Sequence, residues 1–215
     1  MTLKFRMLKF NVITLFPNLF EEHLNNLPFK KAITKKLIAI NLVNLRDFAL
    51  NSYGTVDDKP YGGGTGMILM IEPIYKALEG LKHPILLSPT GIKYNQKKAG
   101  ELSKLSEITL ICGRYEGVDA RVKDNLVTEV ISIGNYILSG GELAALAIME
   151  SVTRLIPGVL EKQEAFEDES FSNGHLEYPQ YTRPEVFKKM EVPKVLLSGN
   201  HKEIEQWKKK NYTKL

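Results

Sequence analysis

The 215-residue sequence has a single cysteine, Cys112, only four histidines, and no long apolar run. One cysteine excludes an intramolecular disulfide and a zinc site built on paired cysteines, and the histidines lie at no recognisable ligand spacing. The longest unbroken apolar run, 143–149, has seven residues, whereas a membrane helix needs about 20. We therefore expect neither a metal-centred chemistry nor a membrane partner.

No apolar segment typical of an export signal follows Met1, so a cytoplasmic location is expected. Hydrophobic residues make up 43% and charged residues 25% of the chain, which is ordinary for a globular protein and excludes wholesale disorder. The length is enough to bury a hydrophobic core without disulfides.

Charge is distributed unevenly along the chain. Residues 181–215 contain nine Lys or Arg and four acids, an excess of +5, and subtracting this from the net +4 leaves −1 for the first 180 residues. A neutral body with a basic tail indicates a polyanionic partner, nucleic acid first, although a solvated lysine-rich terminal helix gives the same pattern.

Strand patterns alternate with helix patterns, which predicts an α/β fold with a mostly parallel sheet. The expected strands are 10–15, 37–43, 84–88, 108–112 and 129–133. The expected helices are 18–25, 73–79, 95–105, 118–126, 142–155, 184–190 and 202–210. The periodic pattern fades after Pro157. We therefore divide the chain into a domain at 1–160, a linker or active-site loop at 161–180, and a short basic helical piece at 181–215.

The start of the helix expected at 142–155 is the best marked. Ser139 and Glu142 have the spacing of a capping box, and Gly140 and Gly141 allow a sharp turn before the helix.

Small residues follow three of the expected strands. These turns are 88–91, 113–117 and 134–141. In open α/β sheets ligands bind beyond the carboxyl ends of the strands, and glycine lets a ligand approach bare backbone. The three turns together predict one binding site for a flat, mostly uncharged ligand.

A second glycine cluster occupies 61–67, with the sequence Tyr-Gly-Gly-Gly-Thr-Gly-Met. It lacks the Gly-Lys-Ser/Thr of a phosphate-binding loop and the spacing of a dinucleotide fingerprint. It is either a flexible loop or a place where backbone packs closely against a base or a partner chain.

Five ordered motifs resemble those of the bacterial tRNA (guanine-N1)-methyltransferases, in a likeness that covers nearly the whole chain. The motifs are 56–67 (VDDKPYGGGTGM), 87–91 (LSPTG), 112–121 (CGRYEGVDAR), 132–143 (SIGNYILSGGEL) and 181–186 (YTRPEV). The resemblance implies an S-adenosylmethionine-dependent enzyme of the SPOUT class, a cofactor site in a deep trefoil knot, and a homodimer whose subunits share each active site. Its substrate would be N1 of the guanine on the 3′ side of the anticodon in tRNA.

The resemblance also implies which residues hold the cofactor. They come from the three small-residue turns and the strand ends before them: Leu87, Ser88, Pro89, Gly113, Tyr115, Glu116, Ser132, Ile133, Gly134, Asn135, Tyr136, Ile137, Leu138, Gly140 and Gly141. Asn135 replaces the usual aspartate of the family. Mg²⁺ is compatible with this chemistry, but no ligand set in the sequence indicates it.

Methylation of N1 needs a base, because N1 of guanine is protonated at neutral pH, and a cation near O6 would stabilise the anion that develops. By resemblance the cation is Arg154. The base is an acid just before Ser170-Phe171, where the family has Asp and this chain has Glu169, with Asp168 one position earlier. Both acids remain candidates.

Two alternatives to this function stay open. The first is another SPOUT RNA methyltransferase that acts on a ribose 2′-hydroxyl. The second is an inactive relative that binds RNA or the cofactor. Members of the family continue beyond the helix that carries Trp207, so we expect 181–215 to be an incomplete C-terminal domain.

Overall fold

The structure, a computed structural model, describes residues 7–160, 170–171 and 175–214. By contacts the chain divides into one unit that ends at Glu161 and another that begins at Lys162. Each unit is described by itself. Within the described residues, no helix is long and apolar enough to cross a membrane.

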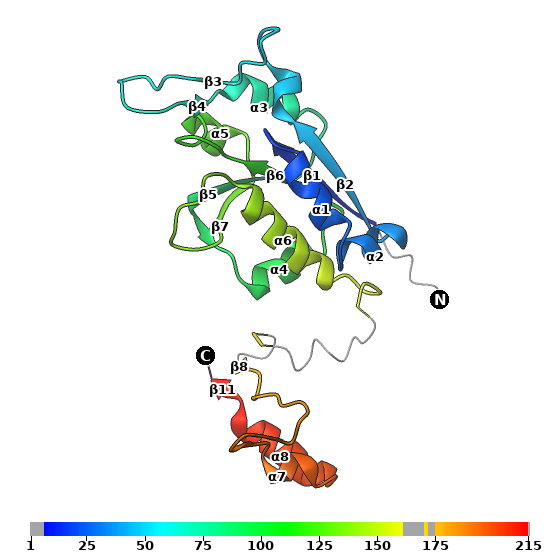
Figure 1. The fold of residues 1–215 in the computed structure, drawn as a ribbon. Helices are drawn as coiled ribbons and strands as arrows, with labels where there is room; N and C mark the ends of the chain where they lie inside the picture. Colours follow the sequence, from blue (N-terminus) through cyan, green and yellow to red (C-terminus); the bar gives the residue numbers. More distant parts are fainter. Residues whose placement is uncertain (1–6, 161–169, 172–174, 215) are drawn as a thin grey trace. The chain divides into compact units, whose positions relative to one another are not determined.

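The first unit is built on a five-stranded sheet in the order β2-β1-β6-β5-β7, in which every neighbouring pair is parallel (Figure 1). The strands are β1 (Leu8–Thr14), β2 (Ile38–Asn44), β5 (Pro84–Lys93), β6 (Glu107–Cys112) and β7 (Glu129–Ser132). The predicted α/β fold with a mostly parallel sheet is therefore confirmed. The trefoil knot stays a prediction.

Alternating side chains of the strands enter two cores, one on each face of the sheet. Phe10 and Val12 of β1 lie in the core that α1 (Asn18–Leu24), α2 (Phe29–Thr34), α4 (Gln96–Leu102) and α6 (Glu142–Arg154) cover. Ile13 lies in the other core, with η1 (Leu45–Phe48), α3 (Ile71–Ala77) and α5 (Ala120–Asn125). A small hairpin of β3 (Asp57–Asp58) and β4 (Ile68–Leu69) encloses the second glycine cluster.

The second unit contains two short antiparallel pairs and two helices. β8 (His175–Leu176) pairs with β11 (Thr213–Lys214), and β9 (Val186–Phe187) pairs with β10 (Met190–Glu191). α7 (Lys194–Leu197) precedes α8 (His201–Asn211). β8 lies inside the stretch predicted as a linker, and its pairing with β11 ties that end of the stretch to the C-terminal unit.

The helix predicted at 184–190 is wrong, because this segment forms the β9–β10 hairpin. Pro184 suits the first turn of a helix, which is why the pattern indicated one. However, Val186 and Phe187 are residue types that favour strands, and Lys188 has a φ of 57°, which reverses the chain between the two strands.

The predicted capping box of α6 is also absent. The helix begins after Gly141, and no side chain caps it. The side chain of Glu142 instead points inward. It is 2% exposed and accepts hydrogen bonds from Thr14 and Arg114. A buried tertiary contact has replaced the local bond that the spacing predicted.

Candidate functional site

A cavity of about 670 Å³ lies in the first unit at the carboxyl ends of β5, β6 and β7. All three small-residue turns that follow these strands contribute to it. The site therefore lies where an open parallel sheet places its ligands, and its size is that of a small-molecule pocket.

The first wall of the cavity is a loop that bulges out of β5. Leu87 and Ile92 both pair with Ile131 of β7, so the four residues between them leave the ladder. At Gly91 a Cβ atom would come within 2.6 Å of the backbone of Val130 and Ile131. Only glycine lets the chain return to the strand at this distance.

The second wall joins the end of β6 to the start of α6. The amide of Gly141 donates to the carbonyl of Gly113 at 2.9 Å, and a Cβ on residue 141 would lie 2.8 Å from the Cα of Cys112. Cys112 is buried beneath this contact, and burial raises the pKa of its thiol, so a thiolate is disfavoured there.

The glycine cluster at 61–67 packs against the loop that follows β6. The amide of Glu116 donates to the carbonyl of Met67 at 3.0 Å, and a Cβ on Gly66 would touch the Glu116 side chain. Tyr61, at the other end of the cluster, is fully exposed. The Met67 end of the cluster therefore packs against this chain's own β6 loop, whereas packing against a base or a partner chain stays a prediction.

The residues that line the cavity include nearly all of those predicted to hold a cofactor. Every member of that set lies on the wall except Asn135. The structure adds ten residues that sequence reasoning missed: Leu86, Thr90, Arg114, Gly117, Val118, Ala120, Lys123, Ile131, Ser139 and Ala144. Most of them lie close in sequence to the three turns, which could have indicated them, whereas Ala120, Lys123 and Ala144 reach the cavity from helices.

Comparison with known proteins decides the family. A sequence model of the family described as tRNA (Guanine-1)-methyltransferase TrmD matches residues 8–214. The chain belongs to this family. The resemblance that the five motifs indicated is confirmed.

Relatives in the TrmD family match at high identity. A tRNA (guanine-N(1)-)-methyltransferase of Carboxydothermus hydrogenoformans is 52% identical over 207 residues, which cover 94% of this chain and 82% of the relative. One from Dictyoglomus turgidum is 50% identical over 212 residues, covering 97% and 86%. The crystal structure of the tRNA (m1G37) methyltransferase of Aquifex aeolicus superposes with a TM-score of 0.78 at 44% identity, covering 94% of this chain and 87% of that one.

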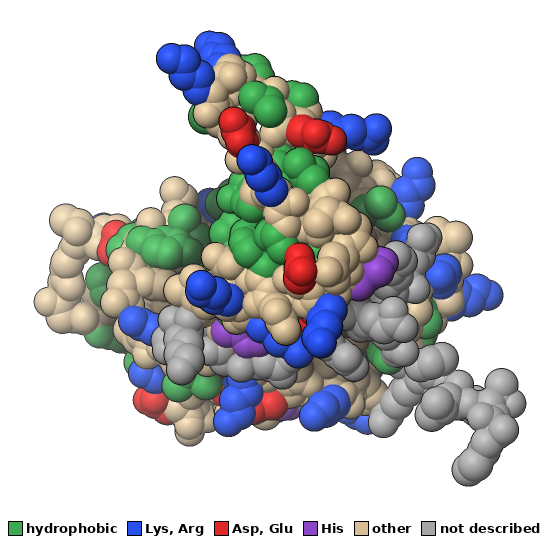
Figure 2. All heavy atoms as spheres, turned by 90° about the horizontal axis from the view of Figure 1, so that it is seen from below, with side chains coloured by type: hydrophobic (Ala, Val, Ile, Leu, Met, Phe, Trp, Pro, Cys, Tyr) green, Lys and Arg blue, Asp and Glu red, His purple; other side chains and the backbone are tan. Residues whose placement is uncertain are grey.

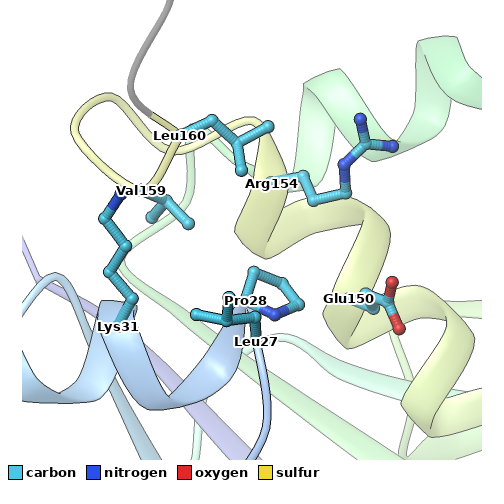
Figure 3. A pocket seen from close by; sticks show the side chains of 7 residues that line it. All are labelled: Leu27, Pro28, Lys31, Glu150, Arg154, Val159 and Leu160. Carbon is cyan, nitrogen blue, oxygen red and sulfur yellow. The ribbon is translucent and has the colours of Figure 1, made fainter.

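Arg154, the cation expected by resemblance, does not line the large cavity. It lines a second cavity of about 370 Å³ together with Leu27, Pro28, Lys31, Glu150, Val159 and Leu160. Figure 3 shows Glu150 and Arg154 on α6, and Leu27 and Pro28 on the segment that leads into α2. Because a helix rises about 1.5 Å per residue, Arg154 lies about 18 Å along α6 from Glu142, at whose end the large cavity opens.

The two candidate bases of the TrmD reaction, Asp168 and Glu169, lie outside the described residues. Ser170, directly after them, accepts a hydrogen bond from the amide of Glu177 at 3.0 Å through its Oγ. Within the described residues no group of three or more His, Cys, Asp or Glu side chains could hold a metal ion.

Proposed function

We propose that this chain transfers a methyl group from S-adenosylmethionine to N1 of the guanine on the 3′ side of the anticodon in tRNA. The observation that carries the proposal is the match to the tRNA (guanine-1)-methyltransferase family over residues 8–214. The cavity at the carboxyl ends of β5, β6 and β7 supports it, because its walls suit the cofactor that such a reaction needs.

The fit of S-adenosylmethionine to the cavity is supported by bare backbone. At Gly141, which lines the cavity, a Cβ atom would meet the backbone of Cys112 at 2.8 Å, so only glycine fits at this point of the wall. A wall of bare backbone suits a flat, uncharged adenine. When bound, S-adenosylmethionine supplies a methyl group activated by its sulfonium charge.

The residues proposed to hold the cofactor are those predicted from the sequence that also line the cavity. From β5 and its loop they are Leu87, Ser88 and Pro89; from the β6 loop Gly113, Tyr115 and Glu116; and from the β7 loop Ser132, Ile133, Gly134, Tyr136, Ile137, Leu138, Gly140 and Gly141. Asn135 is the one predicted residue that we leave out.

The methyl acceptor needs groups that the cavity does not supply. We assign the removal of the N1 proton to Glu169 or Asp168, and the stabilisation of the developing charge at O6 to Arg154. The methyl transfer itself is an in-line displacement, in which holding donor and acceptor in line supplies much of the catalysis.

A homodimer explains how Arg154 can act at the cofactor. Within one chain the cavity and Arg154 lie at opposite ends of α6, about 18 Å apart along its axis. In a homodimer, Arg154 of one copy can instead reach the cofactor cavity of the other copy. α1 packs against α6, and both helices expose a leucine, Leu19 and Leu143, the latter 60% exposed. Exposed apolar side chains of this kind favour burial against another chain.

Binding of tRNA is assigned to the basic C-terminal unit. Residues 181–215 carry the +5 excess, and three consecutive lysines, Lys208–Lys210, lie in the last turn of α8. Figure 2 shows exposed Lys and Arg side chains, with fewer acidic ones in the same view. Lysines at such positions neutralise phosphates, so binding should weaken as salt rises.

The deciding experiment is nucleoside analysis of a tRNA transcript after incubation with the protein and labelled S-adenosylmethionine. We expect N1-methylguanosine, and no product from a matched transcript in which adenosine replaces the target guanosine. A ribose-methylated nucleoside would indicate the alternative SPOUT reaction. Cofactor binding without any product would indicate an inactive relative.

A further inference from the structure

A buried carboxylate lies beneath the proposed cofactor cavity. Glu142, the first residue of α6, is 2% exposed. Its Oε1 accepts hydrogen bonds from Thr14 Oγ1 at 2.8 Å and from Arg114 Nε at 3.1 Å, and its Oε2 lies 2.9 Å from Arg114 Nε. A carboxylate is costly to bury unless it is paired and hydrogen-bonded, so the fold retains Glu142 together with these partners.

Arg114 connects Glu142 to the cavity wall. Its guanidinium lies 4.5 Å from the centre of the Phe16 ring, and its Nη1 donates to the carbonyl of Ser139 at 3.3 Å. Arg114 and Gly140 also form an isolated backbone bridge. Contacts from Phe16, after β1, and from Glu142 of α6 fix the side chain of Arg114. Arg114 itself fixes the turn that precedes α6 through its bond to Ser139.

Gly140 lies directly on this ion pair. A Cβ on residue 140 would collide with Arg114 Nε and would lie 2.5 Å from Glu142 Oε2. The turn at 139–141 therefore takes its position from the Arg114–Glu142 pair, and the same turn lines the cavity.

We propose that Glu142 is a positioning residue for cofactor binding. It fixes Arg114, and Arg114 fixes the turn at 139–141, whose bare backbone receives the adenine part of S-adenosylmethionine. Glu142 does not line the cavity, so it acts through Arg114. This inference rests on the proposed function, because it needs the cavity to be the S-adenosylmethionine site.

The test compares two ligands in the Glu142→Gln variant by calorimetry. S-adenosylmethionine carries a methionine carboxylate, and 5′-methylthioadenosine has the adenosine part without it. We expect both to bind about tenfold more weakly, by the same factor, because the turn that receives adenine is displaced. Weakening of S-adenosylmethionine alone would overturn the proposal, since Arg114 would then contact the carboxylate directly. Unchanged affinity for both ligands would also overturn it.

The rate of methyl transfer at saturating cofactor distinguishes a positioning role from a loss of stability. At saturating cofactor, single-turnover methyl transfer by Glu142→Gln should return to near the wild-type rate, because Glu142 touches no reacting atom. A rate that stays low at saturation would contradict a positioning role. Wild-type protein that binds neither ligand would refute the proposed function itself, a result distinct from failure of this inference.

Two further variants separate positioning from folding. Thr109→Val removes a buried hydroxyl that donates to the carbonyl of Lys82 at 2.8 Å, far along β6 from the cavity. It should lower the melting temperature and leave both affinities unchanged. The double variant Arg114→Met with Glu142→Leu leaves no unpaired buried charge and should fold. It lacks the bond to Ser139, so we expect weak binding in a folded protein, and wild-type affinity would overturn the proposal.

Discussion

Gly141 rests directly on the backbone of Cys112: a Cβ at residue 141 would lie 2.8 Å from the Cα of Cys112. The contact joins the last residue of β6 to the residue before α6, and the bond from the Gly141 amide to the Gly113 carbonyl, at 2.9 Å, reinforces it. Since backbone atoms on both sides are fixed in regular elements, neither can give way cheaply. The width of the cavity at this point is therefore set by the absence of a side chain.

We predict that Gly141→Ala weakens binding of S-adenosylmethionine by at least about tenfold, or about 1.4 kcal/mol, because the methyl group separates β6 from α6. Calorimetric titration measures the affinity of each variant for S-adenosylmethionine. The matched control is Gly100→Ala in α4, where a Cβ would meet nothing within 4 Å. This control should stabilise the protein by about 0.5–1 kcal/mol and leave affinity unchanged. Equal affinity in folded Gly141→Ala would refute the prediction.

Gly91→Ala should destabilise the fold as well as the cavity. Its Cβ would come within 2.6 Å of the backbone of Val130 and Ile131, and relief requires β5 and β7 to part. We expect the free energy of unfolding, measured with urea, to fall by about 2 kcal/mol or more. Gly134→Ala is the comparison, because the three atoms nearest its Cβ belong to the ring of Tyr136, a side chain that is 53% exposed and can shift by giving up one bond of 3.5 Å to the carbonyl of Ile133. A loss in Gly134→Ala as large as that in Gly91→Ala would contradict this reasoning.

The sequence was sufficient to predict the sheet because its signals are local. All five strands of the sheet are short runs rich in Val, Ile and Leu, and the glycine turns after three of them identified the edge where the cavity lies. Helix α2 was missed because 29–34 has only six residues and two lysines in its middle. The hairpin at 186–191 was misread because Pro184 favours both a helix start and a turn.

The parts of the site that sequence reasoning missed depend on contacts between distant residues. Glu142 was assigned to a capping box by its spacing from Ser139, whereas its partners Thr14 and Arg114 lie 128 and 28 residues away. No periodicity reports such a pairing. Arg154 was identified only by resemblance, although its place at the far end of the predicted helix 142–155 already separated it from the turns that line the cavity.

Asp119 should contribute stability that depends on pH. Its side chain caps α5 by accepting from the Arg121 amide at 2.9 Å, and its Oδ2 lies 2.6 Å from Arg121 Nη2. The hydrogen bond from the Arg121 guanidinium lowers the pKa of Asp119 below its ordinary value. A lowered folded-state pKa stabilises the fold above the unfolded pKa, about 3.9, and the effect is lost as pH falls through the folded pKa.

Asp119→Asn is the matched test of this pH dependence, because asparagine keeps a capping oxygen and removes the charge. At pH 7 it should be less stable than wild type by up to about 1 kcal/mol, because the Arg121 side chain is 62% exposed and solvent screens the pair. The difference should vanish below the folded pKa of Asp119. Asp119→Ala should lose about 1 kcal/mol more through the missing cap. A wild-type advantage over Asp119→Asn that persists in strong acid would exclude the charge as its cause.

The shared active site predicts complementation between two inactive proteins. Arg154→Ala lacks the proposed cation, and a variant with Asp168→Ala and Glu169→Ala lacks both candidate bases. If the arginine and the acid serve one site from different subunits, a mixture should recover part of the methyl transfer, because one site of each heterodimer is intact. Light scattering at micromolar concentration should give a dimer. A monomeric wild type, or mixed dimers with no activity, would contradict the arrangement.

The choice between the two candidate bases can be made by single-turnover kinetics. Glu169 occupies the family position before Ser170-Phe171, and Asp168 has the family residue type one position earlier. We favour Glu169, because its place in the chain fixes where the backbone lies and a longer side chain can fold back. A shift by one residue would instead aim the side chain of Asp168 elsewhere.

Glu169→Gln should therefore slow methyl transfer by about 10²–10⁴-fold, the usual contribution of a general base, and leave cofactor affinity unchanged. Asp168→Asn should be mild and serves as the matched control. In the wild type the rate should rise with pH until the base is ionised and then level off, because only the carboxylate form accepts the N1 proton. Glu169→Gln should lose that low-pH limb. A large loss in Asp168→Asn beside a nearly active Glu169→Gln would reverse the assignment, and full activity in both would remove these acids from the reaction.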